Sequence, residues 1–386
     1  MSSRAWLTAV SILVAAPCLA QETPTATAQN PAAQVPPLQQ QVTSTPPDFP
    51  RGRISGYAFG DLYYNVTGDP NHHYNAAGSD SDKTNIDNSA AQQIGKDLNG
   101  FQIRRIYFQL DNDLSIKYST RFRLEADSKS LTSDGKLGVN VKAAYLQARD
   151  LYTRGDGYIG MIPTPTFEYS EEFWGYRAIE KTIADFRAIN SSADIGGEVK
   201  GFVDPDHKFG YSLMVGNGVG QKPEDNRFKR VMLALPMHIG DLRFEPYVDY
   251  QNGANGTDAA TYKALAGYEF KRYAVGFEVV DRVMHRPVGG NQEPLGYSVY
   301  VRSAPATATL GYYARFDLWQ PDKRADNRVD EQLYIAGLDW QPFRDVHVMP
   351  NIEARQFDAK GTAVAPPHNE LQARITFYYR FSKPNS

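Results

Sequence analysis

Cysteine is nearly missing from this chain of 386 residues, which contains only Cys18. Apolar runs of 18 or more residues are also missing after position 20, so the sequence predicts no transmembrane helix. The formal net charge is only -3, which gives no sign of the basic surface that binds nucleic acid. A large chain without disulfides must take its stability from its architecture.

The N-terminal residues have the pattern of a secretory signal peptide. Arg4 supplies a positive charge, residues 5–16 are mostly apolar, and Ala20 is a small residue before a cleavage point. We therefore expect residues 1–20 to be removed, and Cys18 with them. Pro17 stands where a lipoprotein signal would have a small residue, which argues against lipidation. Residues 21–52, rich in Pro, Gln and Thr, are expected to form a disordered leader, and residues 53–386 a single domain.

Beyond residue 53, apolar and polar side chains alternate with a period of two. In one such stretch Tyr118, Phe122 and Leu124 share one parity, and Arg121 and Arg123 share the other. A period of two places alternate side chains on opposite faces of a β-sheet. The sequence therefore predicts an all-β domain built from short strands.

The connections between these strands alternate in length. The long ones are expected near 67–98, 128–137, 164–190, 218–226, 253–258, 284–294, 319–327 and 358–368. The short ones are expected near Asp113, Thr153, Pro205, Gly240, Lys271, Pro305 and Phe343. This count gives about sixteen strands of membrane-crossing length, with long loops outside and short turns inside. A soluble sandwich has no reason for such alternation, so we predict a transmembrane antiparallel β-barrel.

One face of the predicted strands is aliphatic in mid-strand and aromatic toward the ends. Its aromatic members are Tyr64, Phe108, Tyr211, Phe244, Tyr268, Phe277, Trp340 and Phe377. Aromatic girdles are typical of strands that meet both membrane interfaces. The alternative, a soluble sheet with a buried aromatic face, would leave a highly charged solvent face on every strand.

The opposite face carries basic residues from Arg105 to Arg380 and acidic residues from Asp61 to Glu353. Charges are tolerated inside a barrel where water fills the lumen. Many of these residues can also form salt bridges that stiffen the wall. The pattern thus predicts a polar, hydrated interior.

The period changes in only one stretch, residues 163–190. Ile179, Ile183 and Phe186 recur there at helical spacing, with charged residues between them. A long and partly helical connection among β-strands usually has a function. We expect it to be the third external loop, folded inward with a short helix, so that it narrows the lumen.

Candidate constriction residues come from this loop and from the strands before it. Arg105, Arg121 and Arg123 are expected to face Glu171, Glu172 and Asp185 across the narrow passage, which would create a transverse field. Lys117 and Arg177 complete the candidate set. In the alternative interpretation the three arginines only support the wall.

Several motifs resemble the porins related to the phosphate-selective porins O and P. They are Gly100–Arg105, Tyr118–Asp127, Lys142–Leu146 and the loop Pro165–Asp185. The resemblance implies a sixteen-stranded, trimeric channel in the outer membrane with its third external loop folded inward. The resemblance does not by itself imply phosphate specificity, because the anion-selective members of that family share runs of lumenal lysines, whereas the lumenal basic residues here are mostly arginines mixed with acids. The chain also continues five residues past Phe381, where such barrels end on the aromatic residue.

Other motifs give no catalytic or metal site. Adjacent imidazoles tend to point apart, which argues against a metal site at His72 and His73, and the calcium-like loop starting at Asp80 lacks the required Gly and Glu. No metal or cofactor is therefore predicted. We expect the protein to be an outer-membrane porin for small hydrophilic solutes, with a mild preference for anions of the phosphate type. Its barrel is expected to contact membrane lipid and lipopolysaccharide. The alternatives are a barrel enzyme of lipase or protease type and a plugged structural barrel.

Overall fold

The structure is a computed structural model that describes residues 49–72, 93–303, 309–361 and 365–384. The predicted signal peptide, most of the predicted leader, His73, the loop starting at Asp80 and the turn at Pro305 lie outside these ranges. The described elements are β1 Arg51–Thr67, β2 Asn99–Asp113, β3 Tyr118–Leu131, β4 Leu137–Tyr152, β5 Gly155–Pro163, α1 Glu168–Trp174, α2 Ile183–Phe186, β6 Ala193–Phe202, β7 Gly210–Gly216, β8 Arg230–Ala234, β9 Met237–Ile239, β10 Leu242–Asn252, η1 Ala254–Gly256, β11 Asp258–Glu269, β12 Tyr273–His285, β13 Leu295–Ser303, β14 Leu310–Gln320, β15 Arg328–Phe343, β16 Val346–Lys360 and β17 Glu370–Pro384.

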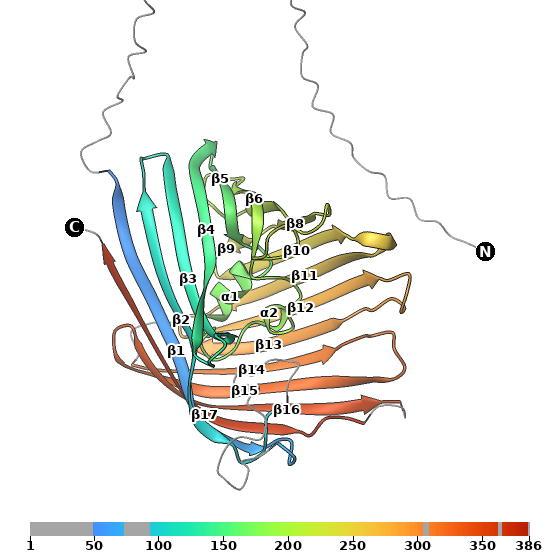
Figure 1. The fold of residues 1–386 in the computed structure, drawn as a ribbon. Coiled ribbons are helices and arrows are strands. Elements are labelled where there is room, and N and C mark those ends of the chain that lie inside the picture. Colours follow the sequence, from blue (N-terminus) through green and yellow to red (C-terminus); the bar gives the residue numbers. More distant parts are fainter. Residues whose placement is uncertain (1–48, 73–92, 304–308, 362–364, 385–386) are drawn as a thin grey trace, which may run out of the picture. The chain divides into compact units, whose positions relative to one another are not determined.

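These strands form one closed antiparallel sheet. Apart from β8 and β9, consecutive strands pair with each other, and β1 pairs with both β2 and β17, which closes the barrel (Figure 1). Both β8 and β9 pair with β10, so they occupy one position in the barrel. Pro236, which has no N–H to donate, lies in the gap between them. The barrel therefore has sixteen strand positions, and the predicted fold class is confirmed.

The connections follow the predicted alternation. Short turns such as 153–154, 240–241 and 344–345 lie at the end of the barrel where β1 begins and β17 ends. Long connections, of which 164–192 is one, lie at the other end. The connection between β3 and β4 is shorter than predicted, because both strands continue into it and leave only 132–136.

Burial along the strands is inverted relative to a soluble protein. On β12 the side chain of Glu278 is 0% exposed, whereas its neighbour Phe277 is 44% exposed. On β17, Arg374 is 3% exposed and Ile375 is 45% exposed. Charged side chains are almost never fully buried unless they are paired, and soluble proteins bury apolar ones instead. The barrel thus turns its charged face inward and its apolar face outward.

A β-bulge in β2 breaks the simple alternation. Phe59 of β1 lies opposite Arg105, but the next residue, Gly60, lies opposite Ile103, so Arg104 is the extra residue. As a result Arg104 and Arg105 are both shielded, at 6% and 7% exposed. The alternation in the sequence placed only Arg105 in the interior, but in the structure Arg104 lies there as well.

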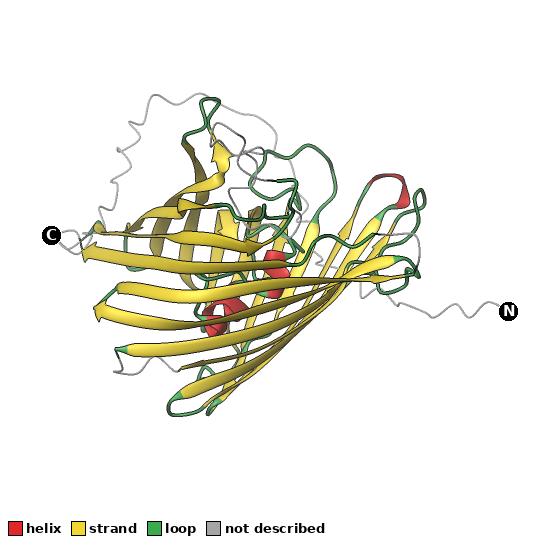
Figure 2. Cartoon of the chain, turned by 90° about the horizontal axis from the view of Figure 1, so that it is seen from below, coloured by secondary structure: helices red, strands yellow, loops and turns green. Residues whose placement is uncertain are grey.

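The segment 164–192 between β5 and β6 carries both α-helices. Figure 2 shows them surrounded by the strands of the barrel. The helices have only 7 and 4 residues. Within the described ranges no helix is both long and apolar enough to cross a bilayer.

Candidate functional site

The segment 164–192 is a closed loop with a defined internal structure. Its two ends meet where the Thr164 hydroxyl donates to the Ser191 carbonyl oxygen at 2.7 Å. Helix α1 ends at Gly175, whose left-handed φ of 73° suits glycine and lets its N–H reach the Glu171 carbonyl. The chain then turns back, and the Trp174 indole N–H donates to the Glu180 carbonyl at 2.9 Å.

One side of this segment is apolar and packs on the wall formed by β11–β16. Trp174 and Ile179 are both 0% exposed. The Trp174 ring lies 4.9 Å from the Tyr300 ring and 6.2 Å from the Tyr313 ring, centroid to centroid, in edge-on geometry. Aromatic pairs of this kind stabilise by about 0.5–1.5 kcal/mol beyond the area they bury. The segment is therefore fixed to one side of the barrel.

Arginines of the wall hold the same segment by its backbone. Each of four guanidinium groups, from β2, β12, β13 and β14, donates to a carbonyl oxygen of the segment. The bonds run from Arg104 to Ile179 at 3.0 Å and also to Ala178, from Arg282 to Ile189 at 2.6 Å, from Arg302 to Phe173 at 2.7 Å, and from Arg315 to Lys181. These four residues are called the anchoring arginines below. Charged donors form the stronger hydrogen bonds, so the path of the segment is set by polar as well as apolar contacts.

Three of the predicted constriction residues meet on the segment itself. Arg177 lies between two carboxylates, with Nε 3.5 Å from Glu171 Oε2 and Nη2 3.3 Å from Asp185 Oδ2. Glu171 also accepts hydrogen bonds from the backbone N–H and the hydroxyl of Thr182 at 2.9 and 3.1 Å. The segment therefore neutralises part of its own acidic charge. Glu172, one residue along α1, is exposed.

These surroundings shift the ionisation of both carboxyl groups. Burial raises the pKa of Glu171, although Arg177 acts in the opposite direction. Burial also acts to raise the pKa of Asp185, but the positive charges of Arg177, Lys181 and Arg105 outweigh it and lower that pKa. Arg105 on β2 is thus close enough to act on Asp185 of the segment.

The predicted arginines of β2 and β3 have partners on the wall. Arg105 Nη1 lies 2.5 Å from Glu125 and 3.0 Å from Asp127, and Arg121 Nε lies 2.6 Å from Asp111. Arg123 instead donates to the neutral Gln109 Oε1 at 2.6 Å. In the described part of the chain Arg123 is paired with no carboxylate, so it keeps its net positive charge.

Lys117 is not brought together with the other predicted residues. It lies in the turn 114–117 between β2 and β3, and its side chain is exposed. The parity argument placed it on a strand, but the strand begins only at Tyr118. The structure therefore does not place Lys117 beside the segment.

Two lysines that the candidate set left out do reach the segment. Lys200 of β6 lies 3.2 Å from Glu168 of α1, and Lys142 of β4 donates to the Ser192 hydroxyl at 2.8 Å. By parity Lys200 belongs to the inward face of its strand, but nothing in the sequence pairs it with Glu168. Lys142 lies next to a register shift in β3–β4, which hides its direction from a parity argument.

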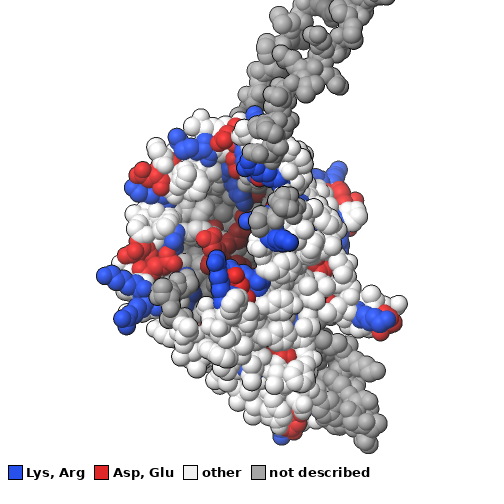
Figure 3. All heavy atoms as spheres, turned by 90° about the vertical axis from the view of Figure 1, so that its left-hand side faces the viewer, with Lys and Arg blue, Asp and Glu red and all other residues white. Residues whose placement is uncertain are grey.

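A cavity of about 1260 Å³ lies between residues 172–178 of the segment and the short turns of the barrel. Figure 3 faces this end of the barrel and shows acidic and basic side chains around a hollow. Six basic residues line the cavity against three acidic ones, namely Arg177, Lys271, Arg272, Arg302, Arg344 and Arg380 against Glu172, Asp339 and Asp345. The cavity is called the vestibule below, and its formal charge is positive.

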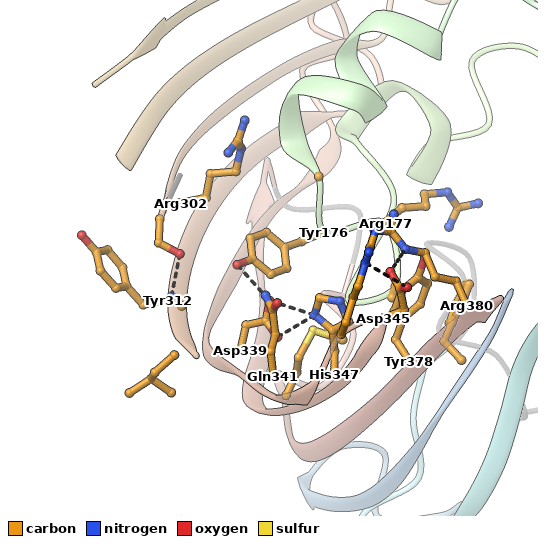
Figure 4. A pocket seen from close by; sticks show the side chains of 18 of the residues that line it. Tyr176, Arg177, Arg302, Tyr312, Asp339, Gln341, Asp345, His347, Tyr378 and Arg380 are labelled. Carbon is orange, nitrogen blue, oxygen red and sulfur yellow. Dashed lines mark hydrogen bonds and ion pairs between the residues drawn. The ribbon is translucent and has the colours of Figure 1, made fainter. Parts of the chain in front are cut away.

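Polar side chains of the vestibule are fixed by one another (Figure 4). Asp339 accepts from the Tyr176 hydroxyl at 3.4 Å and from Gln341 at 3.3 Å, and it contacts His347 Nδ1 at 2.8 Å. Arg380 donates to Asp345 at 2.5 Å. In the described ranges no group of three His, Cys, Asp or Glu side chains is arranged to hold a metal ion.

Comparisons with solved structures show that the barrel fold is shared with several outer-membrane proteins. No protein-family model and no curated protein matches the chain. The barrel is similar to the anion-selective porin from Comamonas acidovorans, with 13% identity, a TM-score of 0.60, and 86% of this chain and 99% of that chain covered. It is also similar to the outer membrane channel DcaP of Acinetobacter baumannii, with 11% identity, a TM-score of 0.57, and coverage of 86% and 97%. A third similar structure is OmpT, an outer membrane protein of Vibrio cholerae in its trimer form, with 14% identity, a TM-score of 0.54, and coverage of 86% and 99%.

Proposed function

We propose that this protein is an outer-membrane porin, a water-filled channel for the passive diffusion of small hydrophilic solutes. The inverted burial carries the proposal, because a closed barrel with charged residues inside and apolar residues outside suits lipid around it and water within it. Its likeness in fold to an anion-selective porin and to an outer membrane channel supports the same function. The proposal includes export by the signal peptide 1–20 and a leader at 21–52.

The segment 164–192 is proposed to form the constriction of this channel. Its apolar side packs on β11–β16, so the passage would run along its other side, past β1–β6. There Arg105, Arg121 and Arg123 of the wall would face Glu171 and Asp185, with Glu172 at the vestibule. The action of Arg105 on Asp185 and the ion pair between Lys200 and Glu168 support this arrangement.

A mild preference for anions follows from the pairing of these charges. Arg105 and Arg121 are balanced by wall carboxylates, and Arg177 is balanced by two acids of the segment. Arg123 and the basic lining of the vestibule leave a positive excess. Because the Debye length is about 8 Å at physiological salt, this excess would favour anions without excluding cations.

A homotrimer in contact with lipid and lipopolysaccharide belongs to the same proposal. The trimer form of the similar OmpT supports it. Cross-linking of the detergent-solubilised protein should then give a three-chain species, and a single-chain species alone would contradict it.

Conductance in a planar lipid bilayer tests the channel directly. The purified, folded barrel should give steady current steps of uniform size in potassium chloride. A folded barrel that stays electrically silent would instead support the plugged barrel or the barrel enzyme. Hydrolysis of lipid or peptide substrates by the same preparation would then separate those two alternatives.

A further inference from the structure

The vestibule has an aromatic wall beside its basic residues. Tyr57 of β1, Tyr378 of β17 and His347 of β16 all line it. The Tyr57 and Tyr378 ring centroids are 5.9 Å apart, and those of Tyr378 and His347 are 5.2 Å apart. The three rings thus form a continuous row over three adjacent strands, called the aromatic row below.

The rings of this row are held in place from behind. Tyr57 lies opposite Tyr107 of β2, and their ring centroids are 4.5 Å apart. Tyr107 is 6% exposed and its hydroxyl donates to Glu125 at 2.6 Å, so it forms a fixed support. His347 is oriented by Asp339 at 2.8 Å. Tyr57 and Tyr378 are only half-buried, which leaves part of each ring open to the lumen.

Two guanidinium groups line the same vestibule as the aromatic row. Arg380 is the residue opposite Tyr57 across β1 and β17, and its side chain is 60% exposed. Arg177 lines the vestibule from the segment, and its contacts with Glu171 and Asp185 are long, at 3.5 and 3.3 Å. Figure 4 shows Arg177 and Arg380 on the same side of the vestibule as Tyr378.

We infer that the vestibule is a subsite for small aromatic carboxylates, solutes of the benzoate class. The inference rests on the proposed porin function and names a solute class for it. A planar ring can stack on Tyr57 or Tyr378, while its carboxylate pairs with a guanidinium in the geometry that arginine favours. Inorganic anions use only the charges, and neutral sugars use only the rings. Only an aromatic anion uses both features.

The size of the vestibule fits a transient site on a diffusion path. Small-molecule pockets enclose roughly 300–1,000 Å³, and the vestibule holds about 1260 Å³. A solute of this class therefore shares the space with water and can leave it. Stacking would raise its concentration at the entrance of the constriction without trapping it.

A pair of matched anions tests this inference in planar bilayers. Benzoate and cyclohexanecarboxylate have the same charge and nearly the same size, but only benzoate is planar and aromatic. Reversal potentials under gradients of the two sodium salts give their permeabilities relative to sodium. The ring contribution predicts that benzoate is about two- to tenfold more permeant. Equal permeability of the two anions in the parent protein overturns the inference.

Variants of the aromatic row locate the effect. The double variant Tyr57→Leu with Tyr378→Leu should bring the permeability ratio of benzoate to cyclohexanecarboxylate close to one. The double variant Tyr57→Phe with Tyr378→Phe should keep the parent's ratio. Tyr145→Leu is the matched control, because Tyr145 is a lumenal tyrosine of β4 that does not line the vestibule. A ratio that falls equally in the control overturns the site.

The potassium chloride conductance separates the two levels of the proposal. If the parent protein conducts potassium chloride but does not distinguish the two anions, only the subsite is refuted. If the folded parent protein conducts no current at all, the proposed porin function is refuted, and so is the subsite. If the leucine variants do not assemble, the comparison of the two anions in the parent still decides the inference.

Discussion

At the scale of single residues, the partner of each charge decides its effect on ion preference. Arg105 is paired with Glu125 and Asp127, so its replacement also alters the surroundings of two carboxylates. Among the described residues Arg123 is paired with no carboxylate and donates to neutral Gln109, so its replacement removes one net positive charge. Arg123 is therefore the cleaner probe of selectivity.

We expect Arg123→Ala to shift the reversal potential under a potassium chloride gradient toward cations. The shift should be largest at low ionic strength, because the Debye length grows to about 30 Å at 0.01 M salt. Lys117→Ala is the matched control, since it removes the same charge from an exposed turn. If both variants keep the parent's reversal potential at low salt, the wall arginines do not set selectivity.

A second prediction concerns acid and Glu171. Because burial raises its pKa, this carboxyl group takes up a proton at a higher pH than an ordinary glutamate. As the pH falls, Glu171 therefore loses its negative charge before Asp185, whose pKa is lowered. The reversal potential should then move toward anions as the pH falls. At neutral pH the variant Glu171→Gln should already have the reversal potential that the parent protein reaches in acid. If this variant keeps the parent's pH profile, Glu171 is not the group that causes the change.

At the scale of elements, the period change in residues 163–190 indicated a helix but not its place. Ile183 and Phe186 do lie in α2, whereas Ile179 precedes it and α1 lies farther upstream. The anchoring arginines were beyond prediction, because each bonds to a backbone carbonyl and such bonds leave no trace in side-chain patterns. Arg104 and Lys142 were missed because both lie at register shifts, where alternation no longer reports direction.

Deletion of Phe173–Arg187 tests the segment as an element. The deletion removes Trp174, Arg177 and Asp185 with the backbone that carries them, so we expect a larger single-channel conductance from a barrel that still folds. Heat-modifiable migration on a denaturing gel serves as the folding control. A correctly folded deletion variant with the parent's conductance would place this segment outside the conducting path.

At the scale of the whole molecule, the sequence predicted most of the architecture. Sixteen positions, antiparallel order and alternating connections all follow from a two-residue period broken at regular intervals. The interruption between β8 and β9 was not foreseen, although Pro236 is its physical cause. Ion pairs across the lumen could not be foreseen, because the sequence does not tell which charged neighbour a long side chain chooses.

The inverted burial gives a prediction for the isolated protein. Large apolar side chains such as Trp340, 51% exposed, and Phe381, 48% exposed, cover the outer face of the barrel. Exposed apolar patches of more than a few hundred Å² drive association in water. Residues 53–381 should therefore be β-rich by circular dichroism and stay monodisperse only in detergent. Monodisperse protein in plain buffer, measured by light scattering, would contradict the barrel's membrane setting.

The anchoring arginines also restrict the motion of the segment 164–192. Four strands hold the same short stretch of backbone, so a second position for it would require several charged hydrogen bonds to break together. Gates are built from elements with two stable positions, whereas these bonds all stabilise one position of the segment. We therefore expect a constriction of constant width. Single-channel recordings should show a steady current, without transitions to sublevels, at both signs of the applied voltage.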